Sequence, residues 1–223
     1  MSSPDHIVFV VDDDFRVREG LHELLSSMGF NAAVFGSAGE YHACPKPDLP
    51  ACLILDVQLP DINGLDLQQQ IAEKAHPPIV FITGHGDIPS SVRAIKAGAV
   101  DFLTKPFSDE ALMASIRAAI ALDRKARVEN AELARLQQRF SSLTPREREV
   151  LPLVVSGLLN KQAAARLGIS EITLQIHRSK IMQKMQADSL AALVRMAGTL
   201  KVPLTCVDSA AAALPDRKLR HDR

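Results

Sequence analysis

The feature that most constrains the fold is a series of five short apolar runs in the first half of the chain, each followed by a helix-like stretch. The runs cover residues 7–11, 32–35, 52–55, 79–82 and 101–103. A continuous apolar run ended by polar residues is typical of a strand that is buried on both faces. Strands that alternate with helices predict right-handed βαβ units and one parallel sheet with helices on both sides.

The helix-like stretches between these runs support the same α/β architecture. Val17, Leu21, Leu24, Leu25 and Met28 follow helical spacing, and Gly29 ends the pattern. Further helices are predicted over 37–44, 64–74, 89–97 and from about residue 108. For five strands, the leading candidate is the doubly wound, flavodoxin-like strand order 2-1-3-4-5. We assign this domain to residues 1–122.

The second half of the chain is predicted to be helical throughout. Residues 108–140 contain no Gly or Pro and form one long helix, of which 123–140 is expected to be a solvated linker because heptads are not sustained. Thr144, Pro145 and Glu147 form a helix start with a capping box. Residues 141–200 therefore predict an all-α domain of four helices, and residues 201–223 a disordered tail.

Charge separates the two halves. Residues 1–107 contain 14 acidic and seven basic side chains, a net charge of −7, whereas residues 141–200 contain four and eight, a net charge of +4. Such an asymmetry indicates two domains with different partners. No apolar run approaches the roughly 20 residues that span a bilayer, so no membrane partner is expected. Three cysteines without metal-type spacing fit a reducing cytoplasm.

Polar residues follow four of the five predicted strands. Asp12 and Asp13 follow the first strand, Asp56 the third, Thr83 the fourth and Lys105 the fifth. Ligands of open α/β sheets bind beyond the carboxyl ends of the strands at the switch point, here between the first and third strands. A single strand-end Asp is usually a helix cap. Five such side chains on four strands instead predict a site in which three carboxylates face a hydroxyl and an ammonium group.

The chemistry of this cluster favours phosphoryl transfer. Clustered carboxylates repel one another unless a cation lies among them, and hard oxygen ligands suit Mg²⁺. Asp56 is the best nucleophile candidate because it stands alone at its strand end, while Asp12 and Asp13 form a pair suited to the metal. Mg²⁺, Lys105 and Thr83 would stabilise the charge on the phosphoryl oxygens.

Four stretches of residues 5–122 resemble the receiver domain of two-component response regulators. They are VVDDD (10–14), LILDVQLPDINGLDL (53–67), VFITGHGD (80–87) and KAGAVDFLTKPF (96–107). The resemblance implies that Asp56 is the phosphoacceptor. It also implies that one Mg²⁺ is held by Asp13, Asp56 and the backbone carbonyl of Gln58, with Asp12 acting through water. The TGHGD run is similar to that of FixJ-type regulators.

The resemblance also implies a switch and a dimer interface. Thr83 and Lys105 would bind the phosphoryl group, and the bond between Lys105 and Pro106 is usually cis in this family. When Thr83 swings toward the phosphoryl oxygens, Phe102 on the last strand can enter the vacated space. Dimerisation is implied through the fourth helix and fifth strand, about 89–105, with four candidate polar contacts: Ser91, Arg93, Lys96 and Asp101.

The basic domain contains a helix, a Gly-containing turn and a second helix, over 161–167, Gly168 and 170–185. This arrangement places a second helix in the major groove of DNA, although it also fits a small bundle with a solvated face. We assign one stripe to the core: Leu174, His177, Ile181 and Met185. The opposite face has side chains that can contact bases: Ile172, Gln175, Ile176, Ser179 and Gln183. Phosphate contacts are expected from Lys161, Thr173, Arg178, Lys180 and Lys184.

Three stretches of residues 142–200 resemble the LuxR-type helix-turn-helix. They are LTPREREVL (143–151), GLLNKQAAARLGIS (157–170) and TLQIHRSKIMQKM (173–185). The resemblance implies a four-helix domain that binds palindromic or repeated half-sites as a dimer. Gln175 stands where the family often has Lys, so the base preference is expected to differ from that of other members.

Together these features predict a cytoplasmic transcription regulator that is not an enzyme. A sensor histidine kinase phosphorylates Asp56, the receiver pairs with a second copy, and the helical domain binds promoter DNA, more often to activate than to repress. RNA polymerase is a further candidate partner.

Two alternatives stay open from the residues. The first is a phosphorylation-controlled protein whose helical domain binds protein and not DNA. The second is a magnesium phosphatase of the haloacid-dehalogenase type, which needs Asp-x-Asp followed two positions on by Thr or Val. Asp12 does not meet that pattern, because Asp12-x-Asp14 is followed by Phe15 and Arg16. Asp56 does not meet it either, because Gln58 stands where the second Asp is needed.

Overall fold

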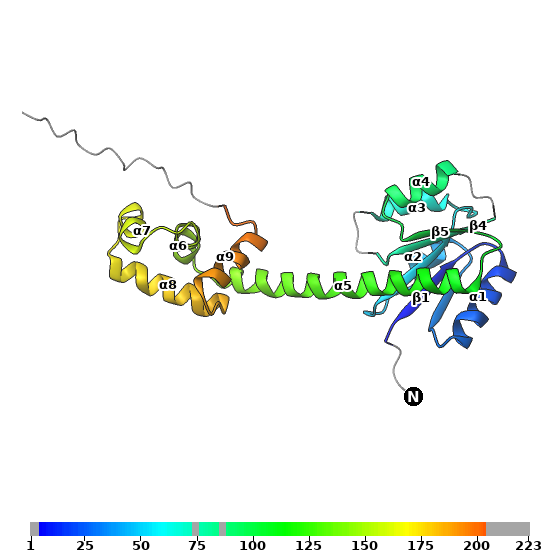
Figure 1. Ribbon diagram of the computed structural model, residues 1–223, viewed down its shortest axis with the longest axis horizontal. Helices are drawn as coiled ribbons and strands as arrows, with labels where there is room; N and C mark the ends of the chain where they lie inside the picture. The colour runs from blue at the N-terminus through cyan, green and yellow to red at the C-terminus, as the bar shows by residue number, and fades with distance from the viewer. Residues whose placement is uncertain (1–4, 73–75, 85–87, 204–223) are drawn as a thin grey trace, which may run out of the picture. The chain divides into compact units, whose positions relative to one another are not determined.

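The computed structural model describes residues 5–72, 76–84 and 88–203. The chain divides into two compact units, Met1–Glu129 and Asn130–Arg223, which we call the α/β unit and the helical unit. Among the described residues, strands occur only in the α/β unit, as Figure 1 shows. The predicted tail over 201–223 lies outside the described residues from position 204 onward.

The α/β unit is built on the parallel sheet that the sequence predicts. Its strands lie in the order β2-β1-β3-β4-β5, which confirms the doubly wound topology. The strand bounds are β1 Ile7–Val11, β2 Ala32–Phe35, β3 Ala51–Asp56, β4 Ile79–Thr83 and β5 Asp101–Thr104. Because β1 pairs with both β2 and β3, the chain direction around the sheet reverses beside β1, and the switch point lies between the ends of β1 and β3.

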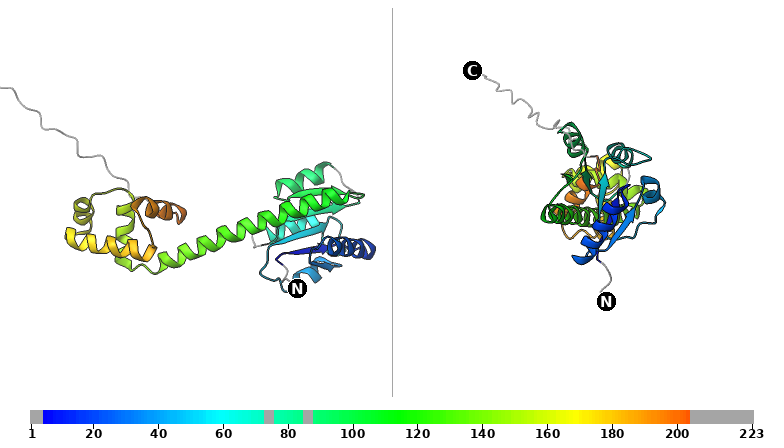
Figure 2. Two further views of the ribbon diagram at one scale, coloured as in Figure 1. Left: turned by 60° about the horizontal axis from the view of Figure 1, so that its bottom comes forward. Right: turned by 90° about the vertical axis from the view of Figure 1, so that its right-hand side faces the viewer.

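Helices cover both faces of this sheet, as Figures 1 and 2 show, and each face has its own core. Val8 and Val10 of β1 pack with α1 and α5, whereas Phe9 and Val11 pack with α2, α3 and α4. This alternation along one fully buried strand explains its continuous apolar sequence. The helix bounds are α1 Phe15–Ser27, α2 Ala38–Ala43, α3 Gly64–Ile71, α4 Ile88–Lys96 and α5 Asp109–Ser141.

One expectation about α5 needs correction. The sequence predicts a solvated linker over 123–140, but the Asp123 side chain is buried. Its Oδ2 accepts hydrogen bonds from the Ala51 amide at 2.8 Å and from Arg127 Nε at 2.7 Å. Arg127 also pairs with Asp48 at 2.5 Å. A charged stretch therefore ties α5 to the start of β3, because the first amide of that strand needs an acceptor.

The described part of the helical unit, 130–203, consists of the end of α5 and four further helices. They are α6 Pro145–Val155, α7 Asn160–Leu167, α8 Glu171–Met185 and α9 Leu190–Thr199. The predicted capping box is present, with Thr144 and Glu147 each accepting from the other's backbone amide. Gly168 ends α7 with a left-handed φ of 64°, which allows the tight turn into α8. Leu151, Leu174 and Ile181 lie at the centre of its core.

Among the described residues, no helix has the length and apolar character needed to cross a membrane.

Candidate functional sites

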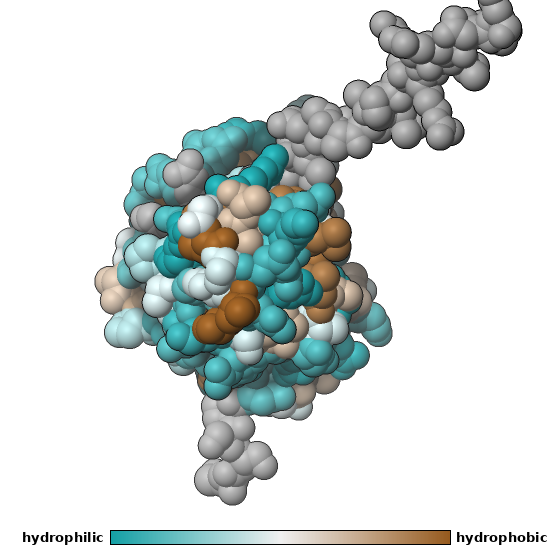
Figure 3. Space-filling model, turned by 90° about the vertical axis from the view of Figure 1, so that its left-hand side faces the viewer, coloured by the Kyte–Doolittle hydropathy of each residue, from teal (hydrophilic) through white to brown (hydrophobic). Residues whose placement is uncertain are grey.

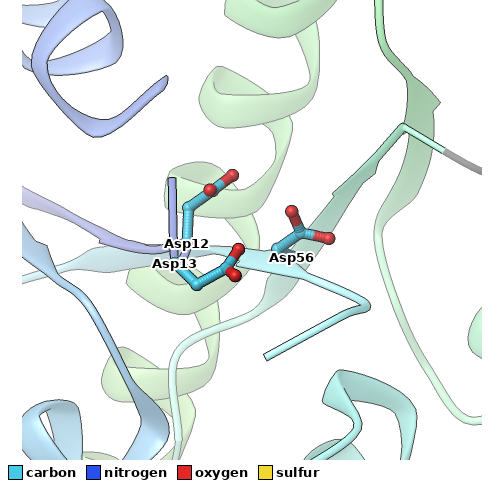
Figure 4. A group of neighbouring side chains, drawn as sticks. All are labelled: Asp12, Asp13 and Asp56. Carbon is cyan, nitrogen blue, oxygen red and sulfur yellow. The ribbon is translucent and has the colours of Figure 1, made fainter. Parts of the chain in front are cut away.

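Three carboxylates meet at the switch point of the sheet. Asp12 and Asp13 directly follow β1, and Asp56 is the last residue of β3. Their ligand oxygens lie within 4.8 Å of one another, and Figure 4 shows the three side chains gathered at the strand ends. Asp12 and Asp56 are buried, whereas Asp13 is exposed. The cluster is therefore held by the sheet and open to solvent on the side of Asp13.

Lys105 follows β5 and reaches the cluster across the end of β4. Its Nζ lies 2.6 Å from Asp12 Oδ2 and 2.9 Å from Asp56 Oδ2. Its amide donates to the carbonyl of Thr83 at 2.7 Å, so the two strand ends that carry Thr83 and Lys105 are joined. The Lys105–Pro106 bond is cis. The structure thus brings together the side chains of Asp12, Asp13, Asp56 and Lys105, with the buried Thr83 at the end of β4.

The charges of this pocket do not balance. Burial raises the pKa of Asp12, an effect that the Lys105 ammonium only partly offsets. Burial would lower the pKa of Lys105, but its two carboxylate partners outweigh burial and raise it. One ammonium faces three carboxylates, and the oxygen ligands are of the hard type that Mg²⁺ prefers. The residues of the pocket therefore fit a divalent cation beside Asp13.

Backbone amides fix the orientation of the two buried carboxylates. Asp12 Oδ1 accepts from the Asp14 amide at 2.9 Å, and Asp56 Oδ1 accepts from the Gln58 amide at 3.1 Å. Asp56 therefore has one oxygen on an amide and the other on the Lys105 ammonium. A carboxylate held in this way is preorganised for attack along one direction.

Gly64 is a contributor that the sequence does not reveal. A Cβ at this position would lie 2.2 Å from the backbone oxygen of Asp56. The Gly64 amide donates to the carbonyl of Val57 at 2.8 Å, and Gln58 forms a bridge with Asn63. The loop between β3 and α3 therefore folds back against the end of β3, which only a residue without a side chain permits. Its signal in the sequence is a single Gly after Asn63, which also fits an ordinary helix start.

The second candidate site is the exposed face of α8. Leu174, Ile181 and Met185 are buried on one side of this helix. The residues predicted to contact bases lie exposed on the other side: Ile172, Gln175, Ile176, Ser179 and Gln183. Three of the residues predicted to contact phosphate differ in exposure. Lys161 and Lys180 are exposed, whereas Arg178 is half-buried and donates a hydrogen bond to Asn160 Oδ1 at 3.1 Å.

Two protein families match the chain in these two regions. Residues 8–117 match the response regulator receiver domain, and residues 141–197 match the bacterial regulatory proteins of the LuxR family. Nodulation protein W of Bradyrhizobium diazoefficiens is 50% identical over 90% of this chain and 89% of its own length. The chain belongs to the two-component response regulators. Members of this family take signals from histidine kinases and bind DNA.

Further relatives agree with the assignment of this response regulator. The protein TodT of Pseudomonas putida is 45% identical over 90% of this chain and 89% of its own length. The solved structure of response regulator StyR is 47% identical, covers 87% of this chain and 98% of that one, and has a TM-score of 0.77. The relatives named FixJ are transcriptional regulatory proteins, which supports a regulator over the phosphatase alternative.

The predicted switch residue of the regulator lies on β5. Phe102 is half-buried, and its ring centroid is 6.0 Å from that of the fully buried Phe81 on β4. Thr83 and Thr104 are paired at the ends of the same two strands, two residues beyond this aromatic pair. The Phe102 side chain thus packs against the core on one side and is accessible to solvent on the other.

Polar residues of the predicted dimer interface have partners within the same chain. Arg93 pairs with Asp66 at 2.6 Å, Asp101 accepts from the Ser115 hydroxyl at 2.5 Å, and the Ser91 hydroxyl donates to the carbonyl of Ile88. Lys96 is exposed. Beside them, three apolar side chains of α4 that the sequence did not single out are exposed at helical spacing, with 80%, 45% and 48% of their surface accessible: Ile88, Val92 and Ile95.

Lys184, one of the predicted phosphate contacts, forms an ion pair within the helical unit. Its Nζ lies 2.7 Å from Glu147 Oε2, and the Glu147 side chain is buried. The same ammonium donates to the carbonyl of Ser142 at 3.3 Å. A buried carboxylate requires a partner charge, so Lys184 joins α8 to the start of α6 instead of facing outward. The sequence hides this because a Lys at the edge of a basic helix looks the same in either role.

Acid should loosen this junction. Burial would raise the pKa of Glu147, but its bonds to Lys184 and Thr144 outweigh burial and lower it. Stability from this lowered pKa is complete above the unfolded value, about 4.3, and is lost as the pH falls through the folded value. Glu147→Gln should therefore destabilise the helical unit by about 1–2 kcal/mol near neutral pH and by progressively less below about pH 4.

Hydrogen exchange of peptides from α6 and α8 measures this effect without interference from the α/β unit. The two proteins are compared at each pH, so that the intrinsic exchange rates cancel. Glu149→Gln, on the exposed side of α6, is the matched control. A difference between wild type and Glu147→Gln that stayed constant down to pH 3 would contradict the lowered pKa.

Proposed function

We propose that this regulator accepts a phosphoryl group on Asp56 from a sensor histidine kinase. The observation that carries the proposal is the Asp56 carboxylate, fixed between the Lys105 ammonium and the Gln58 amide beside two further carboxylates. Asp13, Asp56 and the backbone carbonyl of Gln58 would hold one Mg²⁺, with Asp12 acting through water. The bound Mg²⁺ supplies positive charge that offsets the carboxylates and the incoming phosphoryl oxygens.

The residues of the chain carry out the transfer itself. An Asp56 oxygen attacks phosphorus while the bond between phosphorus and the imidazole nitrogen of the kinase breaks, so that the phosphoryl group moves to the carboxylate. Lys105 and Thr83 then bind its oxygens. Phosphorylation adds about one to two negative charges, and Thr83 moves toward them while Phe102 enters the space that it leaves.

We assign the consequence of this switch to dimerisation through α4 and β5. Charge and polar contacts of Ser91, Arg93, Lys96 and Asp101 would surround an apolar centre. That centre is the exposed stripe of α4, because self-association through it would bury surface that water now covers: Ile88, Val92 and Ile95.

The paired regulator binds promoter DNA in the cytoplasm through the exposed face of α8 and activates transcription, with RNA polymerase as a further partner. A net charge of +4 over residues 141–200 and the exposed Lys161 and Lys180 support DNA as the ligand of the helical unit.

Selection of bound sequences from random duplex DNA, with and without Mg²⁺ and a small-molecule phosphodonor, tests the proposal. We expect a motif of two half-sites that is enriched only with the donor. Enrichment that does not depend on the donor would overturn the phosphorylation switch, and no enrichment in either condition would overturn DNA binding.

A further inference from the structure

The outward face of α8 is unusual in what it exposes. Ile172 has 73% of its surface accessible and Ile176 has 50%, although both are β-branched apolar residues. They stand one turn apart, and Gln175, Ser179 and Gln183 lie on the same exposed face at the spacing of helical neighbours. The other side of the helix is already filled by the core residues Leu174 and Ile181. Packing among the described residues of the helical unit therefore does not explain the two isoleucines.

Charge is arranged around this face and not on it. The exposed Lys180 and the exposed Glu171 lie beside it on α8, and the exposed Lys161 lies on α7. None of the five residues of the face carries a charge, and the structure describes the whole of α8. Figure 3 looks onto the helical unit and shows hydrophobic residues as isolated brown areas within a mainly hydrophilic surface. An uncharged face with the Lys180 ammonium beside it is compatible with base edges that lie between two phosphate backbones.

We propose that α8 selects A·T base pairs, with Ile172 and Ile176 packing on the 5-methyl groups of two thymines and Gln175 binding an adenine. This inference rests on the proposed binding of DNA and specifies which bases are read.

Base chemistry supports this choice over guanine. In the major groove thymine alone among the four bases presents a methyl group, which is the only apolar group that an isoleucine can pack on. Adenine presents an acceptor at N7 beside a donor at its N6 amino group. The side-chain amide of Gln can donate to the first and accept from the second, which no other base allows. Guanine is read by Arg or Lys, and neither occurs among the five residues of this face. The N-terminal half of the helix, where Ile172 and Gln175 lie, is the part that contacts bases in this motif.

Replacing single thymines by deoxyuridine isolates the methyl group, because uracil keeps the same hydrogen-bonding groups. The full-length regulator, with Mg²⁺ and phosphodonor, is titrated with its selected duplex and with duplexes substituted at one thymine at a time. We expect two positions in each half-site at which the change lowers affinity about three- to five-fold, the effect of one buried methyl group. Replacing one adenine by 7-deazaadenine should lower affinity about ten-fold.

Variants assign each effect to its side chain. Ile172→Ala and Ile176→Ala should each become insensitive to deoxyuridine at one position, and Gln175→Ala should become insensitive to 7-deazaadenine. All three residues are exposed, so truncation leaves the core intact. Lys161→Ala is the control, because loss of a phosphate contact weakens binding to every duplex by the same factor and leaves the ratios unchanged.

The outcomes separate this inference from the proposed function. Sequence-selective binding without any response to deoxyuridine would overturn the base assignment and leave DNA binding in place. Failure to bind any duplex selectively would overturn both, and the isoleucines would then mark a surface for a protein partner.

Discussion

Asp56→Asn is expected to abolish incorporation of phosphate from a phosphodonor, because a carboxamide is not a nucleophile toward phosphorus. The substituted side chain keeps its size, and its oxygen can still accept from the Gln58 amide as Asp56 does at 3.1 Å. Loss of incorporation would therefore report chemistry and not misfolding. Labelled phosphate retained on the protein after gel filtration measures the reaction. Sedimentation of the same samples should show that the variant stays monomeric with donor.

Lys105→Ala provides an informative comparison. This ammonium contacts Asp56 without being attacked or displaced, so its removal should slow incorporation by about 10²–10³-fold without abolishing it. Asp48→Asn is the matched control. Asp48 precedes β3, whereas Asp56 ends it, and its side chain is fully exposed. It should incorporate phosphate at the wild-type rate.

The result that would contradict the assignment is equally specific. If Asp56→Asn still incorporated phosphate at the wild-type rate, the exposed Asp13 would become the acceptor, since its carboxylate lies in the same cluster. The labelled peptide would then contain residues 12–14 and not the end of β3.

Parallel topology made the pocket predictable from the sequence. Once five apolar runs imply a parallel sheet, the residues after each run must lie along one edge, and the switch point selects β1 and β3. Asp12, Asp56 and Lys105 then lie close together, because all three stand at carboxyl ends of parallel strands on this edge. The same reasoning found the exposed and buried sides of α8, because helical periodicity separates Leu174 from Gln175 without knowledge of any contact.

What the sequence did not reveal are the contacts that charged residues make with partners far away along the chain. Asp123 and Lys184 both occur in charged stretches that are typical of solvated helix surfaces. Each has a buried partner, the Ala51 amide in one case and the Glu147 carboxylate in the other. These partners lie 72 and 37 positions away, so periodicity along one helix carries no information about them. Only the packed structure distinguishes such residues from their solvated neighbours.

Gly64→Ala is expected to damage the regulator more than its size suggests. The new Cβ would lie 2.2 Å from the backbone oxygen of Asp56 and 3.2 Å from Val57 Cα. A Cβ does not approach another heavy atom to 2.2 Å without a shift of one of them. Both neighbours here belong to the backbone, which cannot rotate away as a side chain would. The loop must move outward, and with it the Gln58 amide that fixes Asp56. We expect a loss of about 1–3 kcal/mol of stability together with slowed phosphorylation.

Gly20→Ala is the matched control for this substitution. Gly20 lies within α1, and no heavy atom lies within 4 Å of its added Cβ. Alanine there should stabilise the protein by about 0.5–1 kcal/mol, because glycine has the greater entropy in the unfolded chain.

Both proteins can be followed by the near-ultraviolet signal of Tyr41, the single tyrosine of a chain without tryptophan. Tyr41 is buried in the core of the α/β unit, so its signal reports the unfolding of that unit alone. If Gly64→Ala unfolded at the wild-type denaturant concentration, the loop would have room to move. The close approach to Asp56 would then not be what places the phosphoacceptor.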